Sequence, residues 1–124
     1  MIKKYRFLLF FYLVITAGLA YAKSTYHFEG RNFKATIDYD CSEGNISCNK
    51  LHLTSTKIKD NSTIKLSGET INVNCPDVCD FRGYRFKNGK YMYSFYPSLE
   101  GDDLWSYIVT LNEKVIAKDS GTIH

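Results

Sequence analysis

The chain of 124 residues has few of the residues and motifs from which enzyme active sites are usually built. Histidine occurs only at His27, His52 and His124, and no G-x-S-x-G or H-E-x-x-H motif is present. A domain of this length also has a small core, which leaves little room for a buried catalytic group with an altered pKa. We therefore expect a protein that is not an enzyme and that uses no metal or cofactor.

Acidic residues are absent from the first 28 positions, whereas Lys3, Lys4 and Arg6 make the beginning of the chain basic. Residues 7–20 (FLLFFYLVITAGLA) follow as an apolar run, and Ala20-Tyr21-Ala22 places small side chains at the two positions that a signal peptidase reads. This combination is typical of a secretory signal peptide. A retained membrane helix is the alternative, but spanning a bilayer takes ~20 apolar residues, more than this run provides.

No later segment is apolar enough to span a membrane, and the chain contains no internal repeat, low-complexity tract or linker. We expect residues 1–22 to be cleaved and residues 23–124 to form one β domain in the periplasm or outside the cell. The signal segment carries the whole formal charge of +3, because 13 basic and 13 acidic residues follow it. We therefore expect neither nucleic acid nor, after cleavage, a membrane as a partner.

Four cysteines, Cys41, Cys48, Cys75 and Cys79, lie after the signal segment. An even number of cysteines in a small exported domain predicts two disulfides. Zinc and redox sites fit less well, because they commonly use C-x2-C pairs, which are absent here. Long-range pairings would stabilise the fold by about 3.5 to 4 kcal/mol each, against roughly 2 to 2.5 kcal/mol for local ones. We nevertheless favour Cys41–Cys48 and Cys75–Cys79, because each pair flanks turn-like sequence between predicted strands.

Apolar and polar residues alternate with a period of two along the chain after residue 25, and no window shows a persuasive helical period. The clearest unit is the hairpin 81–96, in which Asn88-Gly89 is the preferred type I′ turn dipeptide. Further strands are predicted at 26–28, 32–39, 51–54, 63–67, 71–73, 104–111 and 114–118. The pattern predicts an all-β fold, a small antiparallel barrel or sandwich of about eight strands with two disulfides.

Two segments are candidate partner-binding sites. In the loop between Cys41 and Cys48, a disulfide would limit the entropy lost on binding. In the hairpin 81–96, cationic and aromatic side chains interleave, and both are common in binding hot spots. The candidate residues are Ser42, Glu43 and Asn45 in the loop, and Arg82, Arg85, Tyr91 and Tyr93 in the hairpin.

Two further patterns resemble known sites without matching them. The segment 82–86 (RGYRF) is similar to part of an RNA-binding signature, but Arg85 stands where that signature has a small residue. Asp38, Asp40 and Glu43 form an acidic cluster that lacks the glycine and the additional oxygen ligands of a calcium loop. We interpret the first as an ordinary hairpin with an aromatic core face and the second as a solvated strand end.

The chain as a whole resembles small periplasmic β-proteins of Gram-negative bacteria. The likeness rests on the signal segment, DYDCSEGNISC (38–48), CPDVC (75–79) and FRGYRFKNGKY (81–91). In size and strand content the chain is also similar to the periplasmic inhibitors of C-type lysozyme, which are small β-barrels. Their S-G-x-x-Y motif is not completed by residues 67–70 (SGET), so the resemblance transfers no inhibitory residue to this sequence.

These observations lead to three functional hypotheses. The first is an exported binding protein with a protein partner, such as an inhibitor or immunity protein against a cell-wall hydrolase. The second is a module that binds a glycan or another small ligand through the aromatic hairpin 81–96. The third is a structural component of the envelope without a discrete site.

Overall fold

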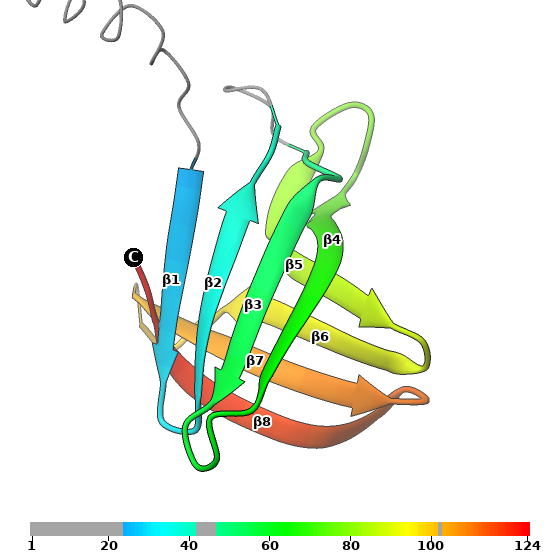
Figure 1. Ribbon diagram of the computed structural model, residues 1–124. Coiled ribbons are helices and arrows are strands. Elements are labelled where there is room, and N and C mark those ends of the chain that lie inside the picture. The colour runs from blue at the N-terminus through cyan, green and yellow to red at the C-terminus, as the bar shows by residue number, and fades with distance from the viewer. Residues whose placement is uncertain (1–23, 42–46, 102) are drawn as a thin grey trace, which may run out of the picture.

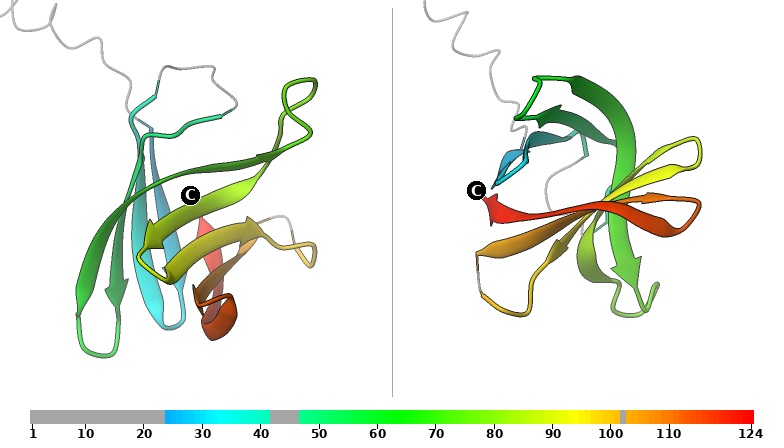
Figure 2. Two further views of the ribbon diagram at one scale, coloured as in Figure 1. Left: turned by 90° about the vertical axis from the view of Figure 1, so that its right-hand side faces the viewer. Right: turned by 90° about the horizontal axis from the view of Figure 1, so that it is seen from below.

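The structure is a computed structural model that describes residues 24–41, 47–101 and 103–124. Eight antiparallel strands form a closed barrel in which each strand pairs with the next and β8 returns to β1 (Figure 1). The right-hand view of Figure 2 shows the end of β8 beside β1. The strands are β1 (Ser24–Gly30), β2 (Phe33–Tyr39), β3 (Leu51–Lys57), β4 (Thr63–Val73), β5 (Asp80–Asn88), β6 (Tyr91–Pro97), β7 (Leu104–Leu111) and β8 (Lys114–Ile123).

The predicted all-β class, the antiparallel barrel and the two disulfides are confirmed. Four strands are longer than the sequence predicts. β1 extends two residues beyond 26–28 at each end, β3 continues from 54 to Lys57, and β8 continues from 118 to Ile123. β4 is continuous where the sequence predicts a break after residue 67. Gly68 explains the continuity of β4, because it pairs with both Leu51 of β3 and Phe86 of β5. A side chain at Gly68 would overlap the backbone of Arg85, so this glycine permits close approach within a strand.

The up-and-down topology divides the connections between two rims of the barrel. The short turns 31–32, 58–62, 89–90 and 112–113 join the two strands of each hairpin and lie on one rim, which we call the turn rim. The described residues of the segments 40–50, 74–79 and 98–103 lie on the other, the loop rim. In Figure 1, β1 to β4 lie side by side and β6 to β8 cross them, so each rim bends around the molecule.

The barrel interior is filled mainly by aromatic side chains. Phe95 and Tyr107 stack with their ring centroids 4.2 Å apart, and Phe28 meets both rings edge-on. The Tyr107 hydroxyl shares a buried hydrogen bond of 2.8 Å with Ser55 Oγ, which satisfies both polar groups inside the core. Burial raises the pKa of Tyr107 to about 12. The largest fully buried side chains are Tyr107, Phe28, Phe86, Phe95, Ile37, Leu51 and Leu53.

The barrel closes at a short seam where β1 and β8 pair over only three residues on each strand. Asp119 of β8 is buried beside this seam, and its carboxylate accepts backbone N–H groups from Arg31, Asn32 and Phe33 at 3.2, 2.9 and 3.0 Å. Gly30 makes room for this contact, since a side chain there would overlap the Asp119 carboxylate. One acidic side chain therefore fixes the β1–β2 turn onto the closing strand.

We expect Asp119→Asn to lower the free energy of unfolding by about 3 kcal/mol, because an amide nitrogen would face N–H donors that the carboxylate now satisfies. Urea denaturation followed by far-UV circular dichroism measures this change. The matched control is Asp40→Asn, an exposed carboxylate on the loop rim, for which we expect a change within about 0.5 kcal/mol. Equal stability of the two variants would show that Asp119 does not hold the seam.

The raised pKa of Tyr107 predicts a loss of stability in alkali. Below pH 10 the phenol is neutral in both the folded and the unfolded chain, so its contribution is fully present. Between pH 10 and about 12 the unfolded chain ionises while the folded chain stays neutral, which lowers the free energy of unfolding by about 3 kcal/mol in total. In Tyr107→Phe, urea denaturation across this range should give a shallower decline. The control variant Tyr96→Phe, at an exposed tyrosine, should decline as the wild type does.

Candidate partner-binding surface

Both disulfides lie on the loop rim. Cys41–Cys48 joins the two ends of the β2–β3 loop, and Cys75–Cys79 closes the β4–β5 loop. These are the two local pairings favoured by the sequence, and they are confirmed. Because disulfides persist mainly in oxidising compartments, their presence indicates an extracellular or periplasmic environment.

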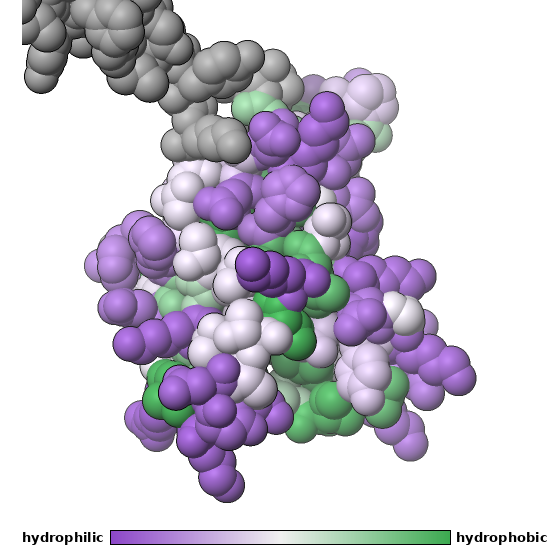
Figure 3. Space-filling model, viewed as in Figure 1, coloured by the Kyte–Doolittle hydropathy of each residue, from purple (hydrophilic) through white to green (hydrophobic). Residues whose placement is uncertain are grey.

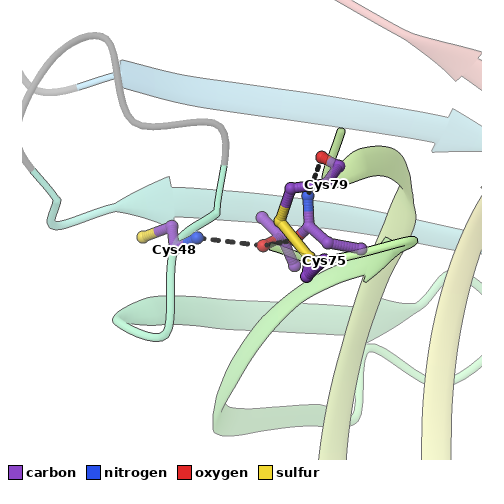
Figure 4. Close-up of a disulfide and its surroundings, with 5 residues drawn as sticks. Cys48, Cys75 and Cys79 are labelled. Carbon is purple, nitrogen blue, oxygen red and sulfur yellow. Dashed lines mark hydrogen bonds between the residues drawn. A yellow bond between two sulfur atoms is a disulfide. The ribbon is translucent and has the colours of Figure 1, made fainter. Parts of the chain in front are cut away.

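A hydrogen-bond network connects the two disulfide loops through β4. The Cys48 N–H donates to Thr70 Oγ1 at 2.9 Å, and the Thr70 hydroxyl donates to Asn72 Oδ1 at 2.6 Å. Asn72 Nδ2 then donates to the Cys79 carbonyl at 3.2 Å. Figure 4 shows Cys48 beside the Cys75–Cys79 disulfide, with its N–H directed toward this network. The loops are thus positioned relative to each other as well as being closed individually.

Aromatic rings fill the barrel mouth between the loops of the loop rim. Tyr84 stacks on Trp105 at a centroid distance of 5.7 Å and meets Tyr39 edge-on at 5.8 Å. Burial raises the pKa of the phenols of Tyr39 and Tyr84. Tyr26 and Phe81 pack around this group, and Phe81 keeps 37% of its surface exposed. The mouth is therefore closed by rings that are partly accessible from outside.

A bulge in β5 determines which side chains reach this mouth. Ile71 of β4 pairs with Gly83, but the next residue, Asn72, pairs with Phe81, so Arg82 is left out of the register. Simple alternation along a strand would place Arg82 on the same face as Tyr84, and the bulge prevents this. Arg82 is exposed, and Phe81 takes the position against the Tyr84 ring instead.

Apolar side chains are exposed at the tips of two loops of this rim. Val78 lies within the disulfide-closed loop and exposes 60% of its surface, and Leu99 of the β6–β7 loop is fully exposed. Each has an acidic neighbour in the chain, Asp77 before Val78 and Glu100 after Leu99. Protein interfaces commonly have an apolar core and a polar rim, so these side chains are the candidate apolar contacts of this rim. No local pattern in the sequence distinguishes either residue, since only the fold shows that their loops share a rim.

The two rims carry opposite charge. We count the residues of each connection together with three strand residues on either side of it. Among the described residues, the loop rim holds six carboxylates, Asp38, Asp40, Asp77, Asp80, Glu100 and Asp103, against two cations, Lys50 and Arg82. The turn rim holds eight cations, Arg31, Lys34, Lys57, Lys59, Lys65, Lys87, Lys90 and Lys114, against three carboxylates, Glu29, Asp60 and Glu113. Basic and acidic residues are thus equal in number after residue 22, but they are distributed unequally between the two rims.

The candidate residues of the sequence analysis are scattered over the molecule. Ser42, Glu43 and Asn45 lie outside the described residues. Arg85 is on the outer face of β5 and forms a half-exposed ion pair of 3.0 Å with Glu69. Tyr91 and Tyr93 are near the turn rim with their rings 6.5 Å apart; Tyr91 is exposed, whereas Tyr93 is partly buried against Tyr107.

Histidine, cysteine and acidic side chains are the groups that could hold a metal ion. His27 and His52 are exposed on strands, and Asp38 accepts a hydrogen bond of 2.8 Å from the Thr25 hydroxyl. Within residues 24–41, 47–101 and 103–124, no group of three or more His, Cys, Asp or Glu side chains is placed to hold a metal ion. The described residues also form no helix long and apolar enough to cross a bilayer.

Comparison of the chain with protein-family models, with curated proteins and with solved structures gave no match. The residues of the loop rim therefore provide the evidence on function.

We expect Thr70→Val to destabilise the fold by about 2 kcal/mol, because the buried Cys48 N–H would lose its acceptor. Hydrogen exchange at the Cys48 amide should accelerate, and urea denaturation should show the lower stability. Thr70→Ser keeps the hydroxyl and serves as the control, with exchange at Cys48 close to that of the wild type. Slow exchange at Cys48 in both variants would contradict the role given to the network.

Proposed function

We propose that this protein is an exported, non-enzymatic binding protein, an inhibitor or immunity protein of a cell-wall hydrolase, and that it contacts its partner through the loop rim. The observation that carries the proposal is the exposure of Val78 and Leu99 on acidic loops at the disulfide-bonded end of the barrel. The basic, apolar and A-x-A segments of residues 1–22 support export to the periplasm.

The chemistry of the loop rim favours a basic protein as partner. A few buried side chains supply most of the energy of a protein contact, while charges around them steer the encounter and select the partner. Val78 and Leu99 provide anchors on separate loops, and the described residues of the loop rim include six carboxylates. An enzyme that acts on an anionic wall polymer attracts its substrate with a positive surface, so such an enzyme would complement this rim.

Preorganisation further supports a binding role. The loop that carries Val78 is closed by Cys75–Cys79 and is tied to the Cys48 loop through Thr70 and Asn72. A loop held in this way loses little conformational entropy when it binds, and that entropy otherwise reduces affinity. The sequence suggested the segment between Cys41 and Cys48 as the preorganised loop, whereas in the structure the β4–β5 loop supports this role.

The aromatic hairpin gives weaker support to glycan or small-ligand binding. Such a site needs accessible ring faces, but Tyr93 is partly buried and packs against Tyr107 of the core. Tyr91 then remains as the exposed ring of this pair. We therefore prefer a protein partner.

We expect the protein, at micromolar concentration, to bind and inhibit a C-type lysozyme or a hydrolase captured from periplasmic extract. The double variant Val78→Ser, Leu99→Ser should weaken this binding at least about tenfold. Calorimetry and lysis of a cell-wall suspension give the affinity and the inhibition. Added salt should slow association, because carboxylates steer the encounter.

The matched control is Val115→Ser, Ile116→Ser, which removes two exposed apolar side chains from the opposite rim. This variant should bind the hydrolase as the wild type does. The absence of any hydrolase partner at micromolar protein would refute the proposal, as would equal loss of affinity in the two double variants.

A further inference from the structure

The turn rim combines cations with exposed apolar side chains. Ile58 lies between Lys57 and Lys59 in the β3–β4 turn and exposes 42% of its surface. Val115 and Ile116 follow Lys114 at the start of β8 and expose 62% and 54%. Figure 3 shows the same mixture on one face, where hydrophobic surface lies between hydrophilic groups at the lower and right-hand edges.

Backbone hydrogen bonds join the four turns into two corners. The Ile58 N–H donates to the Asn32 carbonyl at 3.0 Å, which ties the β3–β4 turn to the β1–β2 turn. The Asn112 N–H donates to the Lys90 carbonyl at 3.1 Å, which ties the β7–β8 turn to the β5–β6 turn. Each corner therefore presents its lysines and apolar side chains on a fixed backbone.

A bulge explains the two consecutive exposed apolar residues in β8. Val109 pairs with Ala117 and Thr110 with Val115, so Ile116 is left out of the register. Lysines and bulges on a strand edge also prevent unwanted pairing with other strands, and this role would explain the presence of Lys114 and of the bulge at Ile116. Protection against strand pairing does not explain why Ile58 is exposed, because Ile58 lies in a turn between two lysines.

We propose that the turn rim docks on the surface of an anionic phospholipid bilayer. Lysines of both corners contact the headgroup phosphates, and Ile58, Val115 and Ile116 enter the interfacial region. Basic segments that also present apolar side chains bind anionic membranes through both contributions. A soluble anionic polymer would use the cations but would leave these three apolar residues in water.

The charge of the loop rim sets the orientation on the membrane. Its carboxylates are repelled by anionic headgroups, so the loop rim faces away from the bilayer. This inference departs from the expectation of no membrane partner after signal cleavage, which rested on the sequence alone. It is independent of the proposed hydrolase partner, because it concerns the opposite rim.

The test is co-sedimentation of the exported, processed protein with vesicles of phosphatidylglycerol and phosphatidylcholine, or of phosphatidylcholine alone. We expect binding to the anionic vesicles only, and a loss of at least about tenfold in affinity for Lys57→Glu, Lys59→Glu. The control Lys50→Glu, Arg82→Glu makes the same change in net charge on the loop rim and should alter affinity by less than about twofold. Equal losses in the two charge variants would overturn the proposal.

The triple variant Ile58→Ser, Val115→Ser, Ile116→Ser leaves the charge unchanged and should weaken vesicle binding at least about fivefold. Unchanged binding would mean simple electrostatic adsorption and would also overturn the proposal. A measurement on the wild type avoids any folding defect of the variants: anionic vesicles should protect Lys57, Lys59 and Lys114 from acetylation while Lys50 stays reactive. Protection of Lys50 to the same degree would contradict the orientation.

Discussion

The barrel is closed by three residue pairs between β1 and β8, and the carboxylate of Asp119 holds this short seam together. A buried carboxylate without donors is costly, and so are buried N–H groups without an acceptor. At the seam both groups are satisfied, because the Asp119 carboxylate accepts hydrogen bonds from the backbone N–H groups of the β1–β2 turn. Gly30 and Gly121 pair directly and have no side chain to block the approach of the two strands. The register of the closing strands thus depends on one acid and two glycines.

Closure brings distant parts of the chain to the same rim. Tyr39, Tyr84 and Trp105 come from β2, β5 and β7, yet their rings are in contact at the loop rim. A layer of buried aromatic side chains, in which Phe95 stacks on Tyr107, packs in the barrel interior beneath these rings. The disulfide loops are linked above this layer through Thr70. Rigidity at the loop rim is therefore a consequence of core packing as much as of the disulfides.

Local patterns in the sequence were sufficient for most strands, for the hairpin 81–96 and for the disulfide pairing, because each depends on neighbouring residues. The turn of that hairpin was predicted one position too early: Asn88 pairs with Tyr91, so Gly89 and Lys90 are the central residues. Gly89 has the positive φ that the turn requires, whereas Asn88 belongs to β5. Long-range contacts could not be predicted in this way. In the sequence Asp119 looks like an ordinary polar residue of a strand, and its role becomes evident only once β8 is placed against the β1–β2 turn. Arg82 follows the alternation, but its place in the register depends on a bulge opposite β4. The sequence shows that lysines cluster near the short turns and acidic residues near the longer loops. Only the up-and-down topology shows that these turns and loops lie on opposite rims.

Exposed apolar residues occur on both rims, so exposure alone does not indicate what each rim binds. The neighbouring charge makes the distinction. Val78 follows Asp77, which suits a basic protein, whereas Ile58 lies between two lysines, which suits anionic headgroups. A domain whose charges balance, as they do after residue 22, can thus favour different partners at its two ends. Because the rim that would bind a membrane is opposite the loop rim, docking there would leave the loop rim accessible to a protein partner.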